Sequence, residues 1–250
     1  MSKHLVRSMW SGIIQLNWRF GLLLIILLGL PRFALVMHAN ETGQYNQVSL
    51  IFVSMMLLPV ILLKKPGSVL IGLVKPARPI WILYSALLGI VFCLIVHFIG
   101  IQLFGHSSSN WFVYISQSYQ VDASILDSRD LFIFFLIYAT TSMFFSPVGE
   151  ELFYRGLVHQ CFQDRFGSNQ ASQIDSAAFA LTHLAHFGIV VHQGRWEILP
   201  IPAILWVLLM FMVSRIFFLC KLQSGSLLGP IVSHAAFNVT MIYLIFYHLL

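Results

Sequence analysis

Charged side chains are scarce in this sequence of 250 residues, of which only 9% are Asp, Glu, Lys or Arg. A soluble domain carries roughly 25% charged residues. The apolar fraction is 58% and the mean hydropathy is +0.85, which is more apolar surface than a globule of this size can remove from water. The composition therefore excludes a soluble domain and a disordered chain, and it predicts a protein that is solvated by a lipid bilayer.

Cysteines are also few. Cys93, Cys161 and Cys220 are too few to hold together a disulfide-rich secreted fold, and we interpret them as free thiols. The chain has no internal repeat, so neither a solenoid nor a transporter built from two similar halves is indicated. It also has no basic run interleaved with aromatic residues, so the net charge of +5 predicts no nucleic-acid partner.

Seven apolar stretches are long enough to cross a hydrocarbon core of about 30 Å, and they predict an all-α, polytopic bundle of seven transmembrane helices. The first stretch is either 13–30, across Arg19, or 20–37, across Arg32. A signal peptide is disfavoured there, because no small-residue cleavage site follows. An eighth span is added if residues 152–166 re-enter the bilayer. The other six stretches are 48–63, 80–104, 131–148, 176–191, 198–214 and 227–249.

Lys and Arg are distributed unequally between the predicted loops, and such residues are retained on the cytoplasmic side. With a cytoplasmic N-terminus, the outer loops hold only Arg129 and Arg195, Arg32 being ambiguous, whereas residues 105–130 contain Asp122, Asp127 and Asp130. We therefore expect a multi-pass protein of a bacterial plasma membrane or an ER-type membrane, with its N-terminus in the cytoplasm. The inner loops collect Lys3, Arg7, Arg19, Lys64, Lys65, Lys75, Arg78, Arg155, Arg165 and Lys221.

A first polar cluster follows the fourth stretch. Ser146 and Pro147 have the pattern of an N-cap followed by proline at the first helical position, so we expect a new helix, or a broken one, to start there. Glu151 and Arg155 are four residues apart and should pair on one helix face. Glu150 points about 100° away around the helix. We therefore expect one neutralised carboxylate and one that is free to react.

Two further clusters lie in the fifth and seventh stretches. Phe179 and His183 share a helix face, and His186 lies close to the end of the fifth span, which we expect at Gly188. His234 and Asn238 share a face in the last stretch. Each histidine, taken alone, is typical of a hydrogen-bonded packing residue. Taken together, however, the three clusters supply a carboxylate, imidazoles and an amide, which are the groups needed to hydrolyse an amide with water.

The residues of these clusters carry a family resemblance. The segments EELFYR at 150–155, FALTH at 179–183 and HAAFN at 234–238 are similar to three motifs, E-E-x-x-x-R, F-x-x-x-H and H-x-x-x-N. These are the motifs of the CPBP family of intramembrane endopeptidases, also called the CAAX-processing and bacteriocin-processing or Abi family, which includes the type II CAAX prenyl endopeptidases. All three occur in order and without departure at the motif positions.

The resemblance implies an intramembrane endopeptidase that cleaves a membrane-anchored protein or peptide, such as a prenylated CAAX terminus or a leader peptide. It implies that Glu150, assisted by His183, activates the attacking water. His234 and Asn238 would stabilise the tetrahedral oxyanion. Glu151, Arg155 and Phe179 would support the site. With the orientation above, Glu150 lies at the cytoplasmic end of its helix, so we expect the site to open toward the cytoplasm. Because water must reach it, we also expect a polar cavity between the helices with the three motifs, closed to lipid except at a lateral gap.

A zinc site is the alternative to this mechanism, with Glu150, His183 and His234 as three ligands and water as the fourth. We favour a metal-free mechanism without a cofactor, because the sequence has no H-E-x-x-H helix and Asn238 suits an oxyanion donor better than a zinc ligand.

Residues 1–250 are interpreted as one integral membrane domain. Its N-terminal spans, 1–130, contain no diagnostic motif, and its catalytic core, 131–250, contains all three. Two other classes of function remain open. One is a catalytically silent membrane scaffold or regulator, and the other is a transporter or channel whose buried polar residues line a path.

Overall fold

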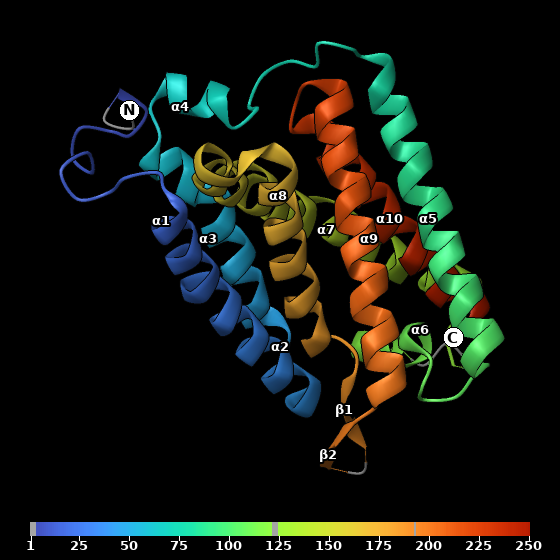
Figure 1. The fold of residues 1–250 in the computed structure, drawn as a ribbon. Helices are drawn as coiled ribbons and strands as arrows, with labels where there is room; N and C mark the ends of the chain where they lie inside the picture. The colour runs from blue at the N-terminus through green and yellow to red at the C-terminus, as the bar shows by residue number, and fades with distance from the viewer. Residues whose placement is uncertain (1–3, 122–124, 193) are drawn as a thin grey trace.

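A computed structural model describes residues 4–121, 125–192 and 194–250, so Lys3 and Asp122, used above for orientation, lie outside the described residues. The chain forms a bundle of long helices (Figure 1). This confirms the all-α membrane architecture, whereas the number of seven spans stays a prediction. A shorter apolar helix, Asn46–Leu62, accompanies five helices that are long and apolar enough to cross a membrane: Trp18–Thr42, Ile80–Phe104, Ser128–Ala185, Pro200–Ser224 and Leu228–His248.

The first span is one continuous rod. The Asn17 side chain caps its start by accepting the backbone N–H groups of Arg19 and Phe20, both at 3.1 Å. Of the two predicted boundaries, 20–37 lies wholly inside this rod, so Arg32 belongs to the span itself. The rod consists of α1 (Trp18–Leu24), a π-helical segment η2 (Ile25–Gly29) and α2 (Leu30–Thr42).

Close contacts between backbones hold the bundle together. A Cβ added to Gly89 of α5 (Ile80–Phe104) would lie only 2.1 Å from the carbonyl oxygen of Ser233 in α10 (Leu228–His248). A Cβ on Gly149 of α7 (Ser128–Glu150) would lie 2.5 Å from the carbonyl oxygen of Phe52 in α3 (Asn46–Leu62). Small residues at such positions let membrane helices pack tightly. The helices and turns before α7 are α3 (Asn46–Leu62), α4 (Lys65–Leu70), α5 (Ile80–Phe104), α6 (Trp111–Ser116) and η3 (Gln117–Tyr119).

The segment with the first motif does not begin a new helix. Pro147 lies inside α7 (Ser128–Glu150), which continues directly into the π-helix η4 (Glu151–Val158) and α8 (His159–Thr182). The prediction of an N-cap at Ser146 is therefore wrong. Membrane helices tolerate an internal proline because neighbouring groups satisfy the freed backbone. The chain reverses later, at Gly167, which has φ 77° inside α8.

The fifth span ends earlier than predicted. α8 closes in a 3₁₀ turn, η5 (His183–Ala185), and Gly188, with φ 110°, leads into a β-hairpin. Strands β1 (Ile189–His192) and β2 (Arg195–Ile198) pair antiparallel, with Ile189 opposite Ile198. The stretch 176–191 is therefore only partly helical. Helices α9 (Pro200–Ser224) and α10 (Leu228–His248) complete the chain.

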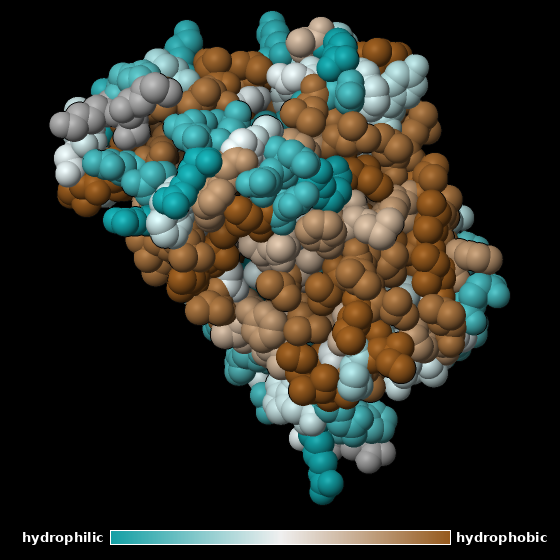
Figure 2. Space-filling view, in the orientation of Figure 1, coloured by the Kyte–Doolittle hydropathy of each residue, from teal (hydrophilic) through white to brown (hydrophobic). Residues whose placement is uncertain are grey.

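The two ends of the bundle differ in charge. A belt of apolar side chains separates polar regions at the two ends (Figure 2). The end that carries the N-terminal segment, α4 and the α9–α10 turn also carries the exposed acid Asp164. The opposite end carries the hairpin, α6 and the start of α7, and its exposed charges are Arg129, Arg195, Glu41, Asp127, Asp130 and Glu197. The exposed cations of the N-terminal end are Arg7, Arg19, Lys64, Lys65, Lys75, Arg78 and Arg165.

Candidate active site

The three polar clusters meet at one cavity of about 660 Å³ inside the bundle. Its wall includes His183 from η5, His234 and Asn238 from α10, and Ser146 from α7. It also includes Arg32 from α2, a residue that lies far from the motifs in sequence. Segments remote in sequence thus bring ionisable and amide side chains together in a wall that is otherwise mainly apolar, as expected of a catalytic site.

Glu150 is fully buried at the end of α7. Its Oε1 lies 2.6 Å from Nη2 of Arg32, and its Oε2 accepts a hydrogen bond of 3.0 Å from the hydroxyl of Ser146. The expectation that Glu150 is unpaired is therefore wrong, because a guanidinium from another helix compensates its charge. The pairing satisfies the rule that a buried carboxylate needs an opposite charge and hydrogen bonds.

Glu151 forms the local ion pair that the sequence predicts. Its Oε2 lies 3.2 Å from Nε of Arg155, four residues along the chain. Its Oε1 accepts a hydrogen bond of 2.8 Å from Nδ1 of His234. Since a carboxylate oxygen only accepts, Nδ1 is the donor in this contact, and the other ring nitrogen, Nε2, lies 3.7 Å from Oε2 of Glu150. His234 therefore stands between the two carboxylates.

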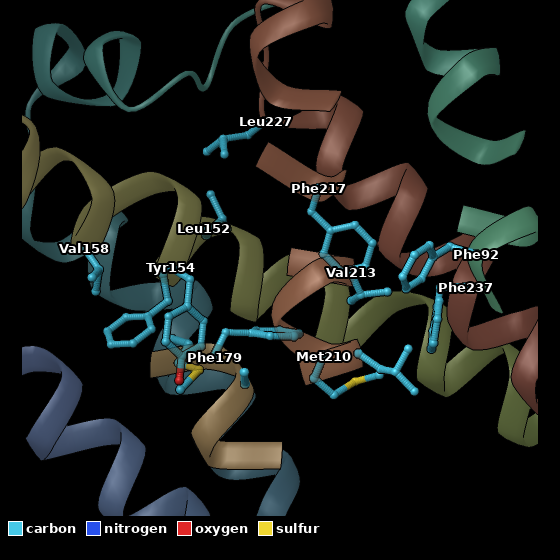
Figure 3. Packing of buried hydrophobic residues seen from close by; sticks show 14 of the residues in the cluster. Phe92, Leu152, Tyr154, Val158, Phe179, Met210, Val213, Phe217, Leu227 and Phe237 are labelled. Atoms are coloured by element: carbon cyan, nitrogen blue, oxygen red, sulfur yellow. The ribbon is translucent and has the colours of Figure 1, made fainter. Parts of the chain in front are cut away.

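Arg155 is held by aromatic rings as well as by Glu151. Its guanidinium carbon lies 4.4 Å from the ring centroid of Phe179 and 5.3 Å from that of Phe217, and Nη2 donates to the Ser214 hydroxyl at 2.7 Å. Both rings belong to the buried cluster drawn in Figure 3. The predicted supporting role of Phe179 has a geometric basis here, because cation–π contacts fix the guanidinium that orients Glu151.

His183 is oriented by its own helix. Its Nδ1 donates to the carbonyl oxygen of Phe179 at 2.8 Å, which leaves Nε2 as the acceptor that faces Arg32 Nη2 at 3.4 Å. The indole N–H of Trp206 donates to the His183 carbonyl oxygen at 2.9 Å. Arg32 therefore contacts both Glu150 and His183, and it links the two residues that the family resemblance pairs.

Asn238 lines the cavity one helical turn beyond His234, as their spacing predicts. One N–H of its side-chain amide donates to the carbonyl oxygen of Ser142 at 3.1 Å. An asparagine amide has two donors. This contact anchors the amide on α7 and leaves its second N–H for another acceptor.

The cavity extends from Arg32 to the end of the bundle that carries the hairpin and α6. Its outer wall includes Tyr45 and Gln120. The Tyr45 hydroxyl donates to Asn40 Oδ1 at 2.6 Å, and burial, reinforced by nearby Tyr114, raises the pKa of Tyr45 to about 12. The phenol is therefore a neutral donor at physiological pH. The exposed cations gather at the other end of the bundle, which is the cytoplasmic end in the predicted orientation. The cavity thus extends to the end that this orientation places outside the cytoplasm, so the predicted orientation and the predicted cytoplasmic opening do not agree.

Two side chains that sequence reasoning left out of the site contact its core. Arg32 also donates to the Thr182 hydroxyl and lies 3.5 Å from Nε2 of His186. A usable signal for Arg32 was present, because an arginine within an apolar span is costly unless it is paired. No sequence pattern identifies Thr182, because its contact with Arg32 forms only where the end of α8 lies against α2.

The three donors of the zinc alternative do not form a metal site in this geometry. Within the described residues, no group of three or more His, Cys, Asp or Glu side chains is arranged to hold a metal ion. The Arg32 guanidinium contacts both Glu150 and His183, so a cation already occupies the space between two of the three proposed ligands. A zinc ion would have to displace it.

Comparisons with known proteins identify one family. Residues 132–240 match the family model described as "Type II CAAX prenyl endopeptidase Rce1-like". No curated protein and no solved structure matches the chain. The matched segment contains Glu150, His183, His234 and Asn238, whereas Arg32 and the α3 wall of the cavity lie outside it.

Proposed function

Since residues 132–240 form a domain of the Rce1-like type II CAAX prenyl endopeptidase family, we propose that this protein is an intramembrane endopeptidase. It hydrolyses a peptide bond of a membrane-associated substrate, a prenylated CAAX-type protein or a leader peptide, with a water molecule activated by glutamate. The observation that carries the proposal is the meeting of His183, His234 and Asn238 at one cavity. Glu150 is buried behind its wall, bound to the lining residues Arg32 and Ser146.

Glu150 is the general base. Oε2 lies 3.7 Å from Nε2 of His234, so water at the cavity wall can be polarised by both groups. Glu150 takes a proton from this water, and the resulting hydroxide attacks the carbonyl carbon. The C–N bond then breaks, and the proton passes to the leaving amine. Arg32 keeps the carboxylate in its reactive orientation, with His183 bound to the same guanidinium.

Asn238 stabilises the oxyanion, and so does His234 when its imidazole is protonated and Nε2 carries an N–H. His234 is oriented by Glu151, which Arg155 fixes in turn. Asn238 is anchored to Ser142 by one N–H and offers the other to the oxygen that becomes negative. Donors held in place before the reaction need no reorganisation when the charge develops, which is why the anchoring contributes to rate.

The catalytic core 131–250 and the N-terminal spans 1–130 act as one integral domain, residues 1–250. The pairing of Arg32 in α2 with Glu150 in α7 supports this proposal, because the core without α2 would contain a buried charge that has no counter-ion. The N-terminus lies in the cytoplasm of a bacterial plasma membrane or ER-type membrane, as the distribution of cations indicates.

The reaction proceeds without a metal. Purified protein is expected to keep its full activity after exhaustive chelation, because the Arg32 guanidinium already compensates Glu150. The measurement is the cleavage rate before and after dialysis against a strong chelator, followed by zinc readdition. A loss that stoichiometric zinc restores would contradict the metal-free mechanism and support the ligand set Glu150, His183 and His234.

The function is tested by comparing protein termini in membranes of cells that express the wild type or Glu150→Ala at equal abundance. Termini that appear only with the wild type would establish proteolysis and identify the substrate. Glu41→Ala, at an exposed glutamate of α2, is the matched control and should behave as the wild type. Identical termini in all three samples would refute the protease and favour a silent membrane scaffold or regulator.

A further inference from the structure

One buried ionisable pair lies apart from the catalytic groups. Nδ1 of His159 lies 2.8 Å from Oδ2 of Asp175, and 2% of the His159 side chain and 0% of the Asp175 side chain are exposed. Neither residue is among the described residues that line the cavity, and neither belongs to the three motifs. Because a buried ion pair contributes little to stability compared with apolar side chains of similar size, stability alone does not account for this pair.

The pair joins the helical segments that carry the first two motifs. The chain reverses at Gly167 inside α8, where φ is 77°. His159 lies in the segment before this turn, which continues from the E-E-x-x-x-R motif, and Asp175 lies in the segment after it, which leads to the F-x-x-x-H motif. Each of the two residues is eight positions from Gly167. The contact therefore bridges the two segments at equal distance along the chain from the turn.

A second contact bridges the same two segments one helical turn nearer the active site. The guanidinium carbon of Arg155 lies 4.4 Å from the ring centroid of Phe179. Arg155 is four residues before His159, and Phe179 is four residues after Asp175. The two contacts therefore require the same alignment of the segments. A slip of one segment by a helical turn would move the Asp175 carboxylate by about 5.4 Å, away from its histidine, and would break both contacts.

This alignment determines where the catalytic imidazoles lie. Arg155 fixes Glu151, which accepts a hydrogen bond from His234. The carbonyl oxygen of Phe179 accepts a hydrogen bond from Nδ1 of His183, and the centroids of these two rings are 4.2 Å apart. Arg155 and Phe179 thus each orient part of the active site from their own segment. A shift between the segments would displace the imidazoles relative to the carboxylates.

Polar groups around the pair favour this one alignment. Lys221 of α9 donates from Nζ to the carbonyl oxygen of Arg155 at 2.5 Å, and both cations lie close enough to Asp175 to interact with its charge. On the other side of the imidazole, Nε2 of His159 lies 3.4 Å from the hydroxyl of Ser168. A buried carboxylate that has its partners in only one alignment selects that alignment, as buried polar groups do in other helix pairs.

We propose that His159 and Asp175 form a positioning pair for catalysis, which sets the alignment of the two segments and so places His183 relative to Glu150. Neither member of the pair touches the reacting atoms. This inference rests on the proposed protease function, because it assigns a role toward that same site. It requires a hydrogen-bond donor at position 159 and a carboxylate at position 175, so filling the same volume with apolar side chains does not replace the pair.

Three variants separate positioning from stability. His159→Leu leaves the Asp175 carboxylate buried without its partner and should lower the unfolding temperature in detergent. The double variant His159→Leu with Asp175→Leu removes both charges and should recover that temperature, because apolar side chains can replace a buried ion pair. His159→Asn keeps an N–H close to the position of Nδ1 and should retain the alignment. Asp164→Leu, at an exposed acid of α8, is the control for Asp175→Leu.

Activity is measured as the yield of the wild-type-specific termini in cell membranes, at equal protein abundance. A misplacement of about 1 Å can cost about 10²-fold in rate, so we expect the double variant to lose at least about tenfold in yield although it is stable. His159→Asn should recover most of the yield, and Asp164→Leu should equal the wild type. Wild-type yield from the double variant would overturn the proposal, and so would a folded His159→Asn protein that recovers nothing.

A distance measurement tests the alignment without the reaction. Phe144 of α7 and Leu181 of α8 are exposed and lie on the two segments that the pair joins, and the native cysteines are buried. Spin labels on Phe144→Cys and Leu181→Cys in the full chain should give one narrow distance distribution by electron paramagnetic resonance. The double leucine variant should shift or broaden this distribution, and Asp164→Leu should not. A distribution unchanged by the double variant would overturn the proposal.

The two measurements separate this inference from the proposed function. If the wild type produces no new termini, the protease function fails, while the spin-label distance still reports whether the pair sets the alignment. If the wild type and the double variant cleave equally and give the same distance distribution, the protease function stands and the positioning role of His159 and Asp175 is wrong.

Discussion

Glu150 and Glu151 are neighbours in the chain and both fully buried, yet their surroundings differ. Glu151 contacts Arg155 and His234, and the aromatic rings around Arg155 close its environment. Glu150 contacts Arg32, from a distant part of the sequence, and Ser146, one turn back, next to the cavity. Glu151 is enclosed between an arginine four residues along the chain and a histidine of α10, whereas Glu150 is held by an arginine of α2 that lies at the cavity wall.

This difference suits the two carboxylates to different roles, one that positions a neighbouring side chain and one that takes part in the reaction. A carboxylate whose two oxygens are fixed by an arginine and a histidine is suited to orienting that histidine. Glu150 has one oxygen, Oε2, at 3.7 Å from Nε2 of His234, and a carboxylate in this position is suited to accepting a proton from water. The following substitutions test this division of roles, beginning with the largest expected effect.

Replacing Glu150 by glutamine removes the base but keeps its shape. We expect the cleavage rate to fall by about 10²- to 10⁴-fold, the range attributed to general acid–base catalysis. The measurement is the initial rate in proteoliposomes, with the unfolding temperature recorded in parallel. Glu41→Gln should keep the wild-type rate. A Glu150→Gln protein that is folded and still active would contradict its role as the base.

Arg155→Met should lower the stability of the protein, because it removes the cation that pairs with the enclosed carboxylate of Glu151. It leaves Glu151 buried without its guanidinium, and breaking a buried pair in this way costs about 3–5 kcal/mol. The free energy of unfolding in detergent measures the loss. Lys75→Met, at an exposed lysine of the same end, should change stability by less than about 0.5 kcal/mol. Equal stability of the two variants would show that Arg155 is not structural.

Arg32→Gln tests the partner of the reactive carboxylate. Loss of a buried charged partner costs about 2–5 kcal/mol, so we expect kcat/KM to fall by at least about 30-fold, since each 1.4 kcal/mol is tenfold. Arg32→Lys retains the charge and should recover part of kcat with KM little changed. If lysine and glutamine variants lose the same activity at equal stability, the charge of Arg32 has no part in catalysis.

Ser146→Ala should have the smallest effect. It removes one hydrogen bond to a carboxylate, which is worth about 1.5–3 kcal/mol. Arg32 still holds the other oxygen of Glu150, so we expect kcat to fall by about tenfold, at the low end of that range. Ser54→Ala removes a comparable hydroxyl from the exposed face of α3 and is the control. A rate unchanged by Ser146→Ala would mean that Arg32 alone positions Glu150.

The features that sequence predicted well depend on short distances along one helix. Apolar length predicts α5 with its observed ends, and four-residue spacing predicts both the Glu151–Arg155 pair and the shared face of His234 and Asn238. The free thiols are also confirmed, because all three cysteines are buried and unpaired. These patterns are decided by helical periodicity, which the sequence carries directly.

The features that sequence missed depend on tertiary contacts. Pro147 has the local pattern of a helix start, but the surrounding bundle keeps α7 continuous through it. The hairpin at residues 189–198 is apolar enough to be taken for helix ends. The pairing of Arg32 with Glu150 requires that α2 lie against the end of α7, which no local pattern specifies.

The Arg32–Glu150 pair also bears on how the protein is made. Arg32 leaves the ribosome long before Glu150 is synthesised, and an arginine at the centre of a helix opposes membrane insertion by about 2.5–3.5 kcal/mol. The first helix therefore enters the bilayer carrying a charge whose partner does not yet exist. Its stable integration should wait for the fourth helix, so that a truncated chain ending before Glu150 would be prone to quality-control degradation.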